Sequence, residues 1–222
     1  VYLYQLSNYN KVVLQRNKLL KELYLHPDYR EVLDVLDMQL VQYGSALIQR
    51  RQTFAEELGE IVHRIHSQLS GGQEEMELKY EPNVTVDAFA QMLFANRERD
   101  MRLKTTATGP HRDDISFVVN GVDIRKFGSQ GQQRTAALSL KLSEIELVKR
   151  LIGDTPVLLL DDVLSELDSG RQNYLLNSIE NIQTLITCTG LDEFVNHRFS
   201  INRIYKVTDG SVTVENKQEA DR

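Results

Sequence analysis

The sequence lacks tryptophan, and its 222 residues include only four prolines and one cysteine, Cys188. A lone cysteine excludes an internal disulfide and fits a reducing compartment, so we expect a cytoplasmic protein. No apolar run approaches the ~18 residues of a membrane span, and no secretory signal opens the sequence. These absences argue against a membrane protein and against a disulfide-stabilised secreted domain.

An excess of basic charge is also missing. Asp and Glu number 32 and Lys and Arg 26, which gives a net charge of -6. This balance excludes a wholly basic nucleic-acid-binding protein, so any contact with DNA must be made by a local patch. Apolar residues make up 41% of the chain and charged residues 26%, as in ordinary globular proteins. The length allows one large domain or two small ones.

The first half of the chain has the pattern of long helices. From about Tyr29 to Leu69, apolar residues recur in steps of three, four and seven, which predicts one long amphipathic helix. Gly71 and Gly72 end it, because glycine readily adopts the left-handed conformation of a helix stop. A further helix is predicted from Phe89 to about Arg102. Over residues 1–105 this pattern predicts an antiparallel, coiled-coil-like arm, and the alternative is a plain helical bundle.

The pattern changes near residue 105, where strands begin to alternate with helices. Asn120-Gly121 separates two short apolar runs and predicts a hairpin with a type I′ turn. Four consecutive apolar residues at 157–160 predict a strand covered on both faces, as in a parallel sheet. The other expected elements are a helix after residue 129, a helix near 171–179, a strand at 184–187 and a hairpin over 204–214. This order predicts an α/β fold class.

Two carboxylates follow the predicted strand at 157–160. In α/β proteins, ligands bind in the crevice at the carboxyl ends of the parallel strands. Mg²⁺ prefers oxygen ligands and can be held by one carboxylate together with phosphates and water. Asp161 is therefore the candidate magnesium ligand, and Asp162 is the candidate group that orients or deprotonates an attacking water. The alternative is that the pair only caps the next turn.

The segment 128–135 opens the predicted helix with serine and glycine. A serine hydroxyl and the free N–H groups of a first helical turn favour phosphate, and Gly131 lets the backbone approach a ligand closely. The candidate nucleotide-contacting residues are Ser129, Gln130, Gly131 and Gln132. The alternative is that Ser129 is only an N-cap on a flexible turn, worth ~1 kcal/mol of helix stability.

Three motifs, in this order, resemble the bacterial RecF family of recombination-repair ATPases, which is related to SMC proteins and ABC-type ATPase heads. They are Gly109-Pro110-His111-Arg112-Asp113-Asp114, Gly128-Ser129-Gln130-Gly131-Gln132-Gln133-Arg134-Thr135 and Leu159-Leu160-Asp161-Asp162-Val163-Leu164-Ser165-Glu166-Leu167-Asp168. They cover about half of the chain, and the helical first half resembles the family's arm less specifically. The resemblance implies an α/β, ABC/SMC-like P-loop NTPase head, its C-terminal part at 106–222, with a mainly helical arm at 1–105.

The resemblance also implies a role for each motif. Ser129–Gln132 resemble the ABC signature, which in this superfamily contacts the γ-phosphate of ATP held by the opposite subunit. Leu158–Asp161 resemble Walker B, and Asp162 stands where most ABC heads have a catalytic Glu. Because Asp reaches less far than Glu, we expect slow hydrolysis. Ser165 and Asp168 belong to a segment resembling the D-loop, which crosses the dimer interface.

Two features depart from the pattern of ABC heads. The sequence contains no Gly-x-x-x-x-Gly-Lys-Ser/Thr, the Walker A loop that cradles phosphate, and it begins with Val1. The resemblance therefore implies the C-terminal portion of a longer protein, a weak ATPase when whole and inactive as this chain alone. Many ABC heads also have a switch histidine after the strand at 184–187. No histidine is there, and His197 lies too far along the chain to be assigned that role.

By resemblance, ATP and Mg²⁺ would drive homodimerisation, and slow hydrolysis would release the dimer. The implied partners are gapped DNA with a single-strand to double-strand junction, and the proteins RecR and RecO, with no membrane. The implied outcome is RecA loading at gaps in the SOS response. Two other hypotheses stay open: an inert DNA- or protein-interaction module, and another SMC- or ABC-type head such as a transporter subunit.

Three other patterns have a simpler structural explanation. Leu69–Gln73 spells the common ABC signature, but we expect these glycines to close a helix, whereas a signature opens one. His63 and His66 share a helix without a cysteine cluster to complete a zinc site, so a solvated helix face is favoured. The run 97–104 carries four basic residues, but acidic residues interleave with them and indicate a mixed-charge face.

The alternative for the basic run is contact with DNA phosphates, since Lys and Arg supply most of the affinity for a nucleic-acid backbone. The candidate DNA-binding residues are Arg102, Lys104 and Arg112. Arg112 lies in the motif 109–114, for which contact with nucleotide, with DNA or with the protein's own fold all remain open.

Overall fold

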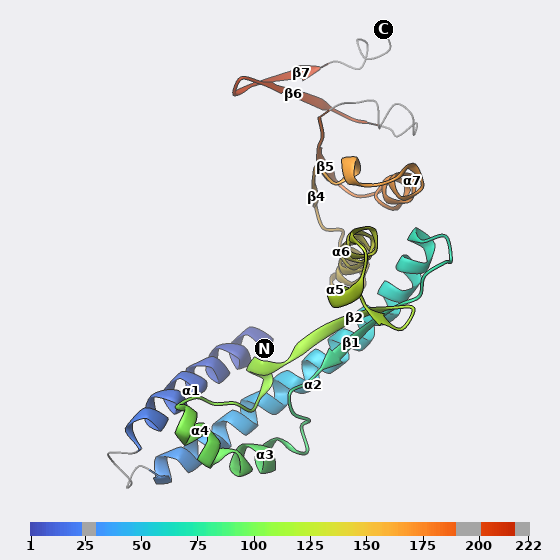
Figure 1. The fold of residues 1–222 in the computed structure, drawn as a ribbon. Helices are drawn as coiled ribbons and strands as arrows, with labels where there is room; N and C mark the ends of the chain where they lie inside the picture. The colour runs from blue at the N-terminus through green and yellow to red at the C-terminus, as the bar shows by residue number, and fades with distance from the viewer. Residues whose placement is uncertain (24–29, 190–200, 216–222) are drawn as a thin grey trace. The chain divides into compact units, whose positions relative to one another are not determined.

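The computed structural model describes residues 1–23, 30–189 and 201–215. The chain divides into two compact units, Val1–Leu151 and Ile152–Arg222, and the elements of each can be followed in Figure 1. The boundary predicted at 105/106 rests on sequence pattern and stays a prediction.

Two long helices form a large part of the first unit. Helices α1 (Tyr2–Glu22) and α2 (Arg30–Leu69) lie side by side and antiparallel (Figure 1). Their direction follows from two contacts, because Arg51 bonds to Tyr2 near one end and Arg16 bonds to Asp37 near the other. Leucines at successive turns of α2, among them Leu33, Leu36, Leu40 and Leu47, are buried against α1.

The predicted end of the long helix is confirmed. Helix α2 ends at Leu69, and Gly71 and Gly72 follow with φ of +64° and +78°. The N–H of Gly72 donates to the carbonyl of Ser67 across 2.7 Å, which satisfies one of the last helical acceptors. Leu69–Gln73 therefore closes a helix, as expected.

The segment predicted as one helix up to Arg102 forms two, α3 (Phe89–Ala95) and α4 (Arg97–Leu103). Asn96 lies between them with φ −88° and ψ 1°, outside the helical region. Its side chain donates to the carbonyl of Met92 and to Thr108 Oγ1, across 2.9 and 3.0 Å. These bonds compete with a continuous helical ladder, as asparagine side chains commonly do.

A three-stranded antiparallel sheet packs next to α2 in the order β1 (Met76–Glu81), β2 (Asp114–Val119), β3 (Val122–Asp123). Met76 pairs with Val119 and Glu81 with Asp114, so the sheet joins segments on both sides of residue 105. The predicted type I′ turn is confirmed, since Asn120 and Gly121 have φ of +49° and +83°. Helices α5 (Ile124–Phe127) and α6 (Gln130–Ile152) follow.

The second unit contains a parallel pair of strands, β4 (Leu158–Asp161) and β5 (Thr184–Thr187), as predicted. The expectation that the strand at 157–160 is covered on both faces is wrong for the described residues. Leu160 is buried, but its neighbour Leu159 is 71% exposed. Alternate residues of a strand point to opposite faces, so one face is covered and the other is open. The described part of this unit also contains α7 (Ser169–Ser178), β6 (Ile204–Thr208) and β7 (Ser211–Glu215).

Within the part of the chain that the structure describes, no helix combines the length and the apolar character that crossing a bilayer requires.

Candidate functional site

The loop before α6 forms a capping box. Ser129 Oγ accepts from the N–H of Gln132 across 3.2 Å, and Gln132 Oε1 accepts from the N–H of Ser129 across 3.1 Å. This reciprocal arrangement satisfies two backbone donors at the start of a helix. The N-cap interpretation of Ser129 is therefore confirmed, and its role toward nucleotide stays a prediction.

The same loop still presents donors to solvent. Gln130 and Gly131 are exposed in the first turn of α6, whose N–H groups precede any intrahelical acceptor. Together with the hydroxyl hydrogen of Ser129, they are suited to an anion. The preceding turn is tight, because a Cβ on Gly128 would lie 2.6 Å from the carbonyl oxygen of Ile124.

The carboxyl end of the parallel pair holds the two acidic candidates. Asp161 is the last residue of β4 and is exposed, and Asp162 follows it with φ +52°. Thr187, opposite Asp161 in β5, donates from Oγ1 to Asp161 Oδ1 across 2.5 Å. The N–H of Asp162 donates to the same Oγ1 across 3.1 Å. Sequence reasoning missed Thr187, although its place at the end of the next strand was a signal.

Asp161 suits the role of a magnesium ligand. Its carboxylate is exposed, and the Thr187 hydroxyl orients one of its two oxygens. No group of three or more His, Cys, Asp or Glu in the described ranges could hold a metal by itself. A Mg²⁺ at Asp161 would therefore take its other ligands from phosphates and water, as Mg²⁺ commonly does.

Ser165 lies next to Asp162, and Asp168 is occupied by its own helix. Ser165 Oγ is 2.9 Å from the Asp162 carbonyl oxygen and 3.0 Å from Asp162 Oδ1. Asp168 caps α7, with Oδ1 accepting from the N–H of Arg171 across 3.1 Å and Oδ2 contacting Arg171 Nη1 at 2.6 Å. The backbone N–H of Arg171 is the main cause that lowers the pKa of Asp168. The second unit thus brings Asp161, Asp162 and Ser165 together.

The basic run is divided between paired and exposed residues. Arg102, Lys104 and Arg112, the candidate DNA-binding residues, are exposed. Arg97 instead lies 2.5 Å from Asp34 and 2.7 Å from Asp37. The run is therefore not one uniform face.

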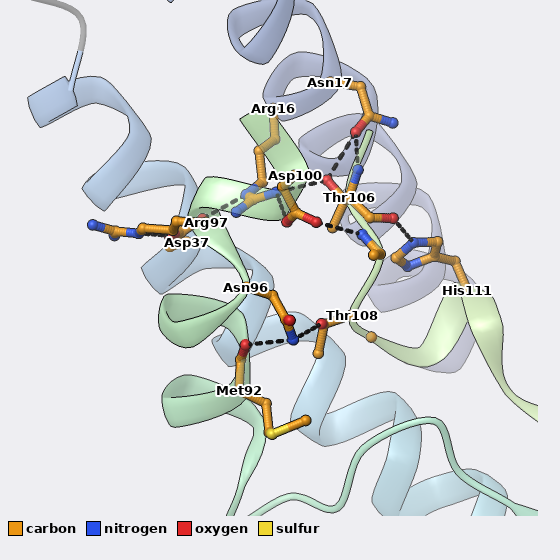
Figure 2. Close-up of polar contacts among 12 residues, drawn as sticks. Arg16, Asn17, Asp37, Met92, Asn96, Arg97, Asp100, Thr106, Thr108 and His111 are labelled. Carbon is orange, nitrogen blue, oxygen red and sulfur yellow. Dashed lines mark hydrogen bonds and ion pairs between the residues drawn. The ribbon is translucent and has the colours of Figure 1, made fainter. Parts of the chain in front are cut away.

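Asp100 corrects the interpretation of the run as a mixed-charge surface. Its side chain is fully buried and accepts from Arg16 Nη1 across 2.7 Å. The same nitrogen donates to Thr106 Oγ1 across 3.0 Å, as Figure 2 shows. Sequence reasoning missed this network. The available signal was the position of Arg16 on the apolar face of α1, four residues after Val12 and three before Leu19.

The motif 109–114 is bound mainly to its own fold. His111 Nδ1 lies 2.7 Å from Tyr9 Oη, and Arg51 donates to Asp113 Oδ2 across 2.9 Å. Tyr80 also donates its hydroxyl to Asp113, and burial is the largest cause that raises the pKa of Tyr80. Arg112 is the exposed basic residue of the motif. These contacts favour a structural role for the motif around an exposed arginine.

The interpretation of His63 and His66 as one solvated face is half wrong. His63 is exposed, whereas His66 is fully buried between α2 and α6. His66 Nδ1 lies 2.9 Å from Ser139 Oγ, and its Nε2 lies 3.2 Å from Glu74 Oε2. His197, considered for the switch position, lies outside the described residues.

Comparison with known proteins gives consistent relatives. No family model matches the chain. The chain is 58% identical over 218 residues to the DNA replication and repair protein RecF of Lachnospira eligens, covering 97% of this chain and 60% of the relative. It is 58% identical over 214 residues to the RecF protein of Agathobacter rectalis, covering 96% of this chain and 59% of that protein.

Solved structures agree with these relatives. A structure of the recombination mediator protein RecF-ATP in the RecFOR pathway is 33% identical, with a TM-score of 0.84, over 97% of this chain and 58% of its own. A second, of RecF-ATPrS, is 34% identical, with a TM-score of 0.81, over 96% and 58%. The chain thus spans about 60% of the length of the curated relatives it matches.

The parallel pair ending in Asp161, the loop that opens α6 and the long antiparallel helices place the chain in the α/β class of folds, and this fold matches the solved RecF structures. Within that class, the chain belongs to the RecF family.

Proposed function

We propose that the RecF-family protein to which this sequence belongs is an ATP-dependent DNA-binding protein of replication and recombinational repair. Relatives at 58% identity are named DNA replication and repair protein RecF, and a solved relative is named RecF-ATP. Residues 1–105 would serve as the arm and 106–222 as part of the ATPase head.

One observation carries this proposal. At the carboxyl end of β4, the Thr187 hydroxyl donates to the Asp161 carboxylate and accepts from the N–H of Asp162. Bound Mg²⁺ would neutralise charge on the phosphates of ATP. Asp161 would hold that ion through its exposed carboxylate. Asp162 would accept a hydrogen bond from the attacking water and take its proton.

Hydrolysis would be slow for two reasons. Asp162 is one methylene shorter than the Glu that most ABC heads have at this position. Its Oδ1 also lies 3.0 Å from Ser165 Oγ, so one of its two oxygens already has a hydrogen-bond partner. The protein would therefore stay in its ATP-bound state for a long time before hydrolysis.

The loop before α6 would act on the ATP of a second copy. Ser129, Gln130, Gly131 and Gln132 present a hydroxyl and helix N-terminal N–H groups, which suit a γ-phosphate. Ser165 and Asp168 would lie along the same dimer interface. ATP binding would then drive homodimerisation, and hydrolysis would release it.

The dimer would bind gapped DNA at a single-strand to double-strand junction and, with RecO and RecR, promote RecA loading in the cytoplasm. Arg102, Lys104 and Arg112 are exposed cations that could neutralise DNA phosphates. With a net charge of -6, the chain would need such a local patch to bind DNA.

The test is Ser129→Arg in the full-length protein, with ATP-dependent dimerisation followed by light scattering. An arginine side chain would fill the space of the incoming γ-phosphate, so we expect dimerisation with ATP to be lost. Ala137→Arg adds the same charge at an exposed position two turns further along α6 and should leave dimerisation intact. Equal ATP-driven dimerisation in Ser129→Arg and Ala137→Arg would refute the proposal.

A further inference from the structure

The side chain of Gln132 has two partners. Its Oε1 accepts from the N–H of Ser129, which closes the capping box, and its Nε2 donates to Glu74 Oε1 across 3.0 Å. Glu74 is far from Gln132 in sequence and follows the turn at the end of α2. One glutamine thus joins the loop that opens α6 to the end of the arm helix.

The carboxylate of Glu74 determines which way the Gln132 amide points. A carboxylate only accepts hydrogen bonds, so the NH₂ group of the amide must face Glu74. The amide oxygen then faces the Ser129 N–H, which needs an acceptor. With Glu74 removed, only the Ser129 N–H would still favour that orientation over its flip, in which two N–H groups would face each other.

Glu74 is itself held in place from α2. Its Oε2 lies 3.2 Å from Nε2 of the fully buried His66, and its backbone N–H donates to Ser70 Oγ across 3.2 Å. The turn at Ser70–Gly72, which follows the end of α2, therefore places Glu74 next to Gln132. His66 Nδ1 also lies 2.9 Å from Ser139 Oγ, so α2 contacts α6 again two turns beyond Gln132.

We propose that Glu74, backed by His66, is a positioning residue for Ser129–Gln132. The pair fixes the hydroxyl and N–H donors of this loop relative to the last turn of α2. This inference rests on the proposed function, in which the loop contacts the ATP of a second copy. It adds that the end of the arm helix sets how well the loop is arranged for that contact.

The experiment compares Glu74→Ala, Glu74→Gln and Glu75→Ala in the full-length protein. Glu75 is the exposed neighbour, and Glu75→Ala makes the same change of charge. Glu74→Gln keeps an oxygen that can accept from Gln132, so it should restore most of what Glu74→Ala loses. Thermal unfolding of each variant shows that it is folded, and Glu74→Asp, which keeps the charge but withdraws the oxygens by one methylene, is the milder substitute.

Two readouts separate positioning from plain stability. Without nucleotide, amide hydrogen exchange at Ser129 and Gln132 should be faster in Glu74→Ala than in Glu75→Ala, because both amides depend on the capping box. With nucleotide, the ATP concentration for half-maximal dimerisation should rise about tenfold in Glu74→Ala, as expected for loss of one charge-assisted hydrogen bond. Glu74→Gln should lie close to the unchanged protein in both.

Each other outcome overturns the inference. Glu74→Ala could match Glu75→Ala in both readouts, or it could exchange faster and yet dimerise normally, and in either case the contact does not position the loop for ATP. Ser129→Arg in the same assay isolates the cause. If Ser129→Arg loses dimerisation while Glu74→Ala keeps it, only this inference fails. If Ser129→Arg keeps dimerisation, the proposed function fails as well.

Discussion

Arg16 donates from Nε to Oδ1 of Asp37 across 2.6 Å, and the Arg16 side chain is fully buried. Its Nη1 donates to the equally buried Asp100, so one arginine of α1 joins α2 and α4. Burying a charge is unfavourable unless it is paired and hydrogen-bonded. Each member of this network therefore depends on the others.

We expect Arg16→Leu to lower the free energy of unfolding by about 3–5 kcal/mol, because it leaves the buried Asp100 carboxylate without its arginine partner, whereas Asp37 keeps Arg97. Urea unfolding followed by circular dichroism measures the change. The surface pair of Arg64 and Glu146 provides the contrast, since both side chains are substantially exposed. Arg64→Leu should cost no more than about 1 kcal/mol. Equal losses in the two variants would contradict the role assigned to the buried network.

Two glycines of α2 give a matched pair of substitutions. A Cβ on Gly44 would lie 2.4 Å from Phe89 Cε1, whereas a Cβ on Gly59 would have no neighbour closer than 3.7 Å. Gly44→Ala should destabilise the protein by about 1–3 kcal/mol through overpacking. Gly59→Ala should stabilise it by about 0.5–1 kcal/mol, because alanine is the better helix former. Thermal and urea unfolding of both variants check the opposite signs.

His111 should make stability depend on pH. Burial lowers the pKa of His111, against a hydrogen bond to the Thr106 carbonyl that raises it. The unfolded chain, with a pKa of about 6.5, then binds more protons than the folded one just below that pH. Stability should therefore rise with pH from the lowered pKa up to about 6.5 and gain nothing more from His111 above it.

Urea unfolding of the unchanged protein and of His111→Gln between pH 5 and 7.5 measures this contribution. The difference between the two isolates His111 from other titrating groups. We expect the unchanged protein to lose more stability than His111→Gln as the pH falls to 5. Parallel pH profiles would show that His111 does not titrate differently on folding.

Asp162→Asn in the full-length protein tests the assignment of the base. Asn tolerates the φ of +52° at this position as well as Asp does, so the fold should be retained. Loss of the acid should lower ATP hydrolysis by about 10²–10⁴-fold, the usual contribution of a general base. ATP-dependent dimerisation should persist and last longer. A hydrolysis rate that is unchanged in Asp162→Asn would assign the base elsewhere.

Local patterns predicted much of the fold. The type I′ turn follows from Asn120-Gly121 alone, and the 40-residue length of α2 follows from its apolar repeat and the glycines that end it. The acidic pair was correctly expected at the end of a parallel strand. In each case the prediction rests on a pattern that is visible in one continuous segment of the chain.

Contacts between distant segments were not predictable in the same way. Arg16 and Asp100 are 84 positions apart, and nothing near Asp100 in sequence distinguishes it from an exposed acid in a mixed-charge run. His66 is buried because α6 covers it, and Glu74 matters because Gln132 reaches it. The open face of β4 likewise depends on what packs over Leu159, which an apolar run alone does not specify.

The order of synthesis determines when the buried Arg16 can form each of its contacts. Asp37 leaves the ribosome 21 residues after Arg16, so the hairpin of α1 and α2 can acquire its first ion pair early. Asp100 arrives only 84 residues after Arg16, and Thr106 after 90. We therefore expect the Arg16 guanidinium to be paired only with Asp37 at first, and the network to be complete only after α4 and the following loop pack against the hairpin.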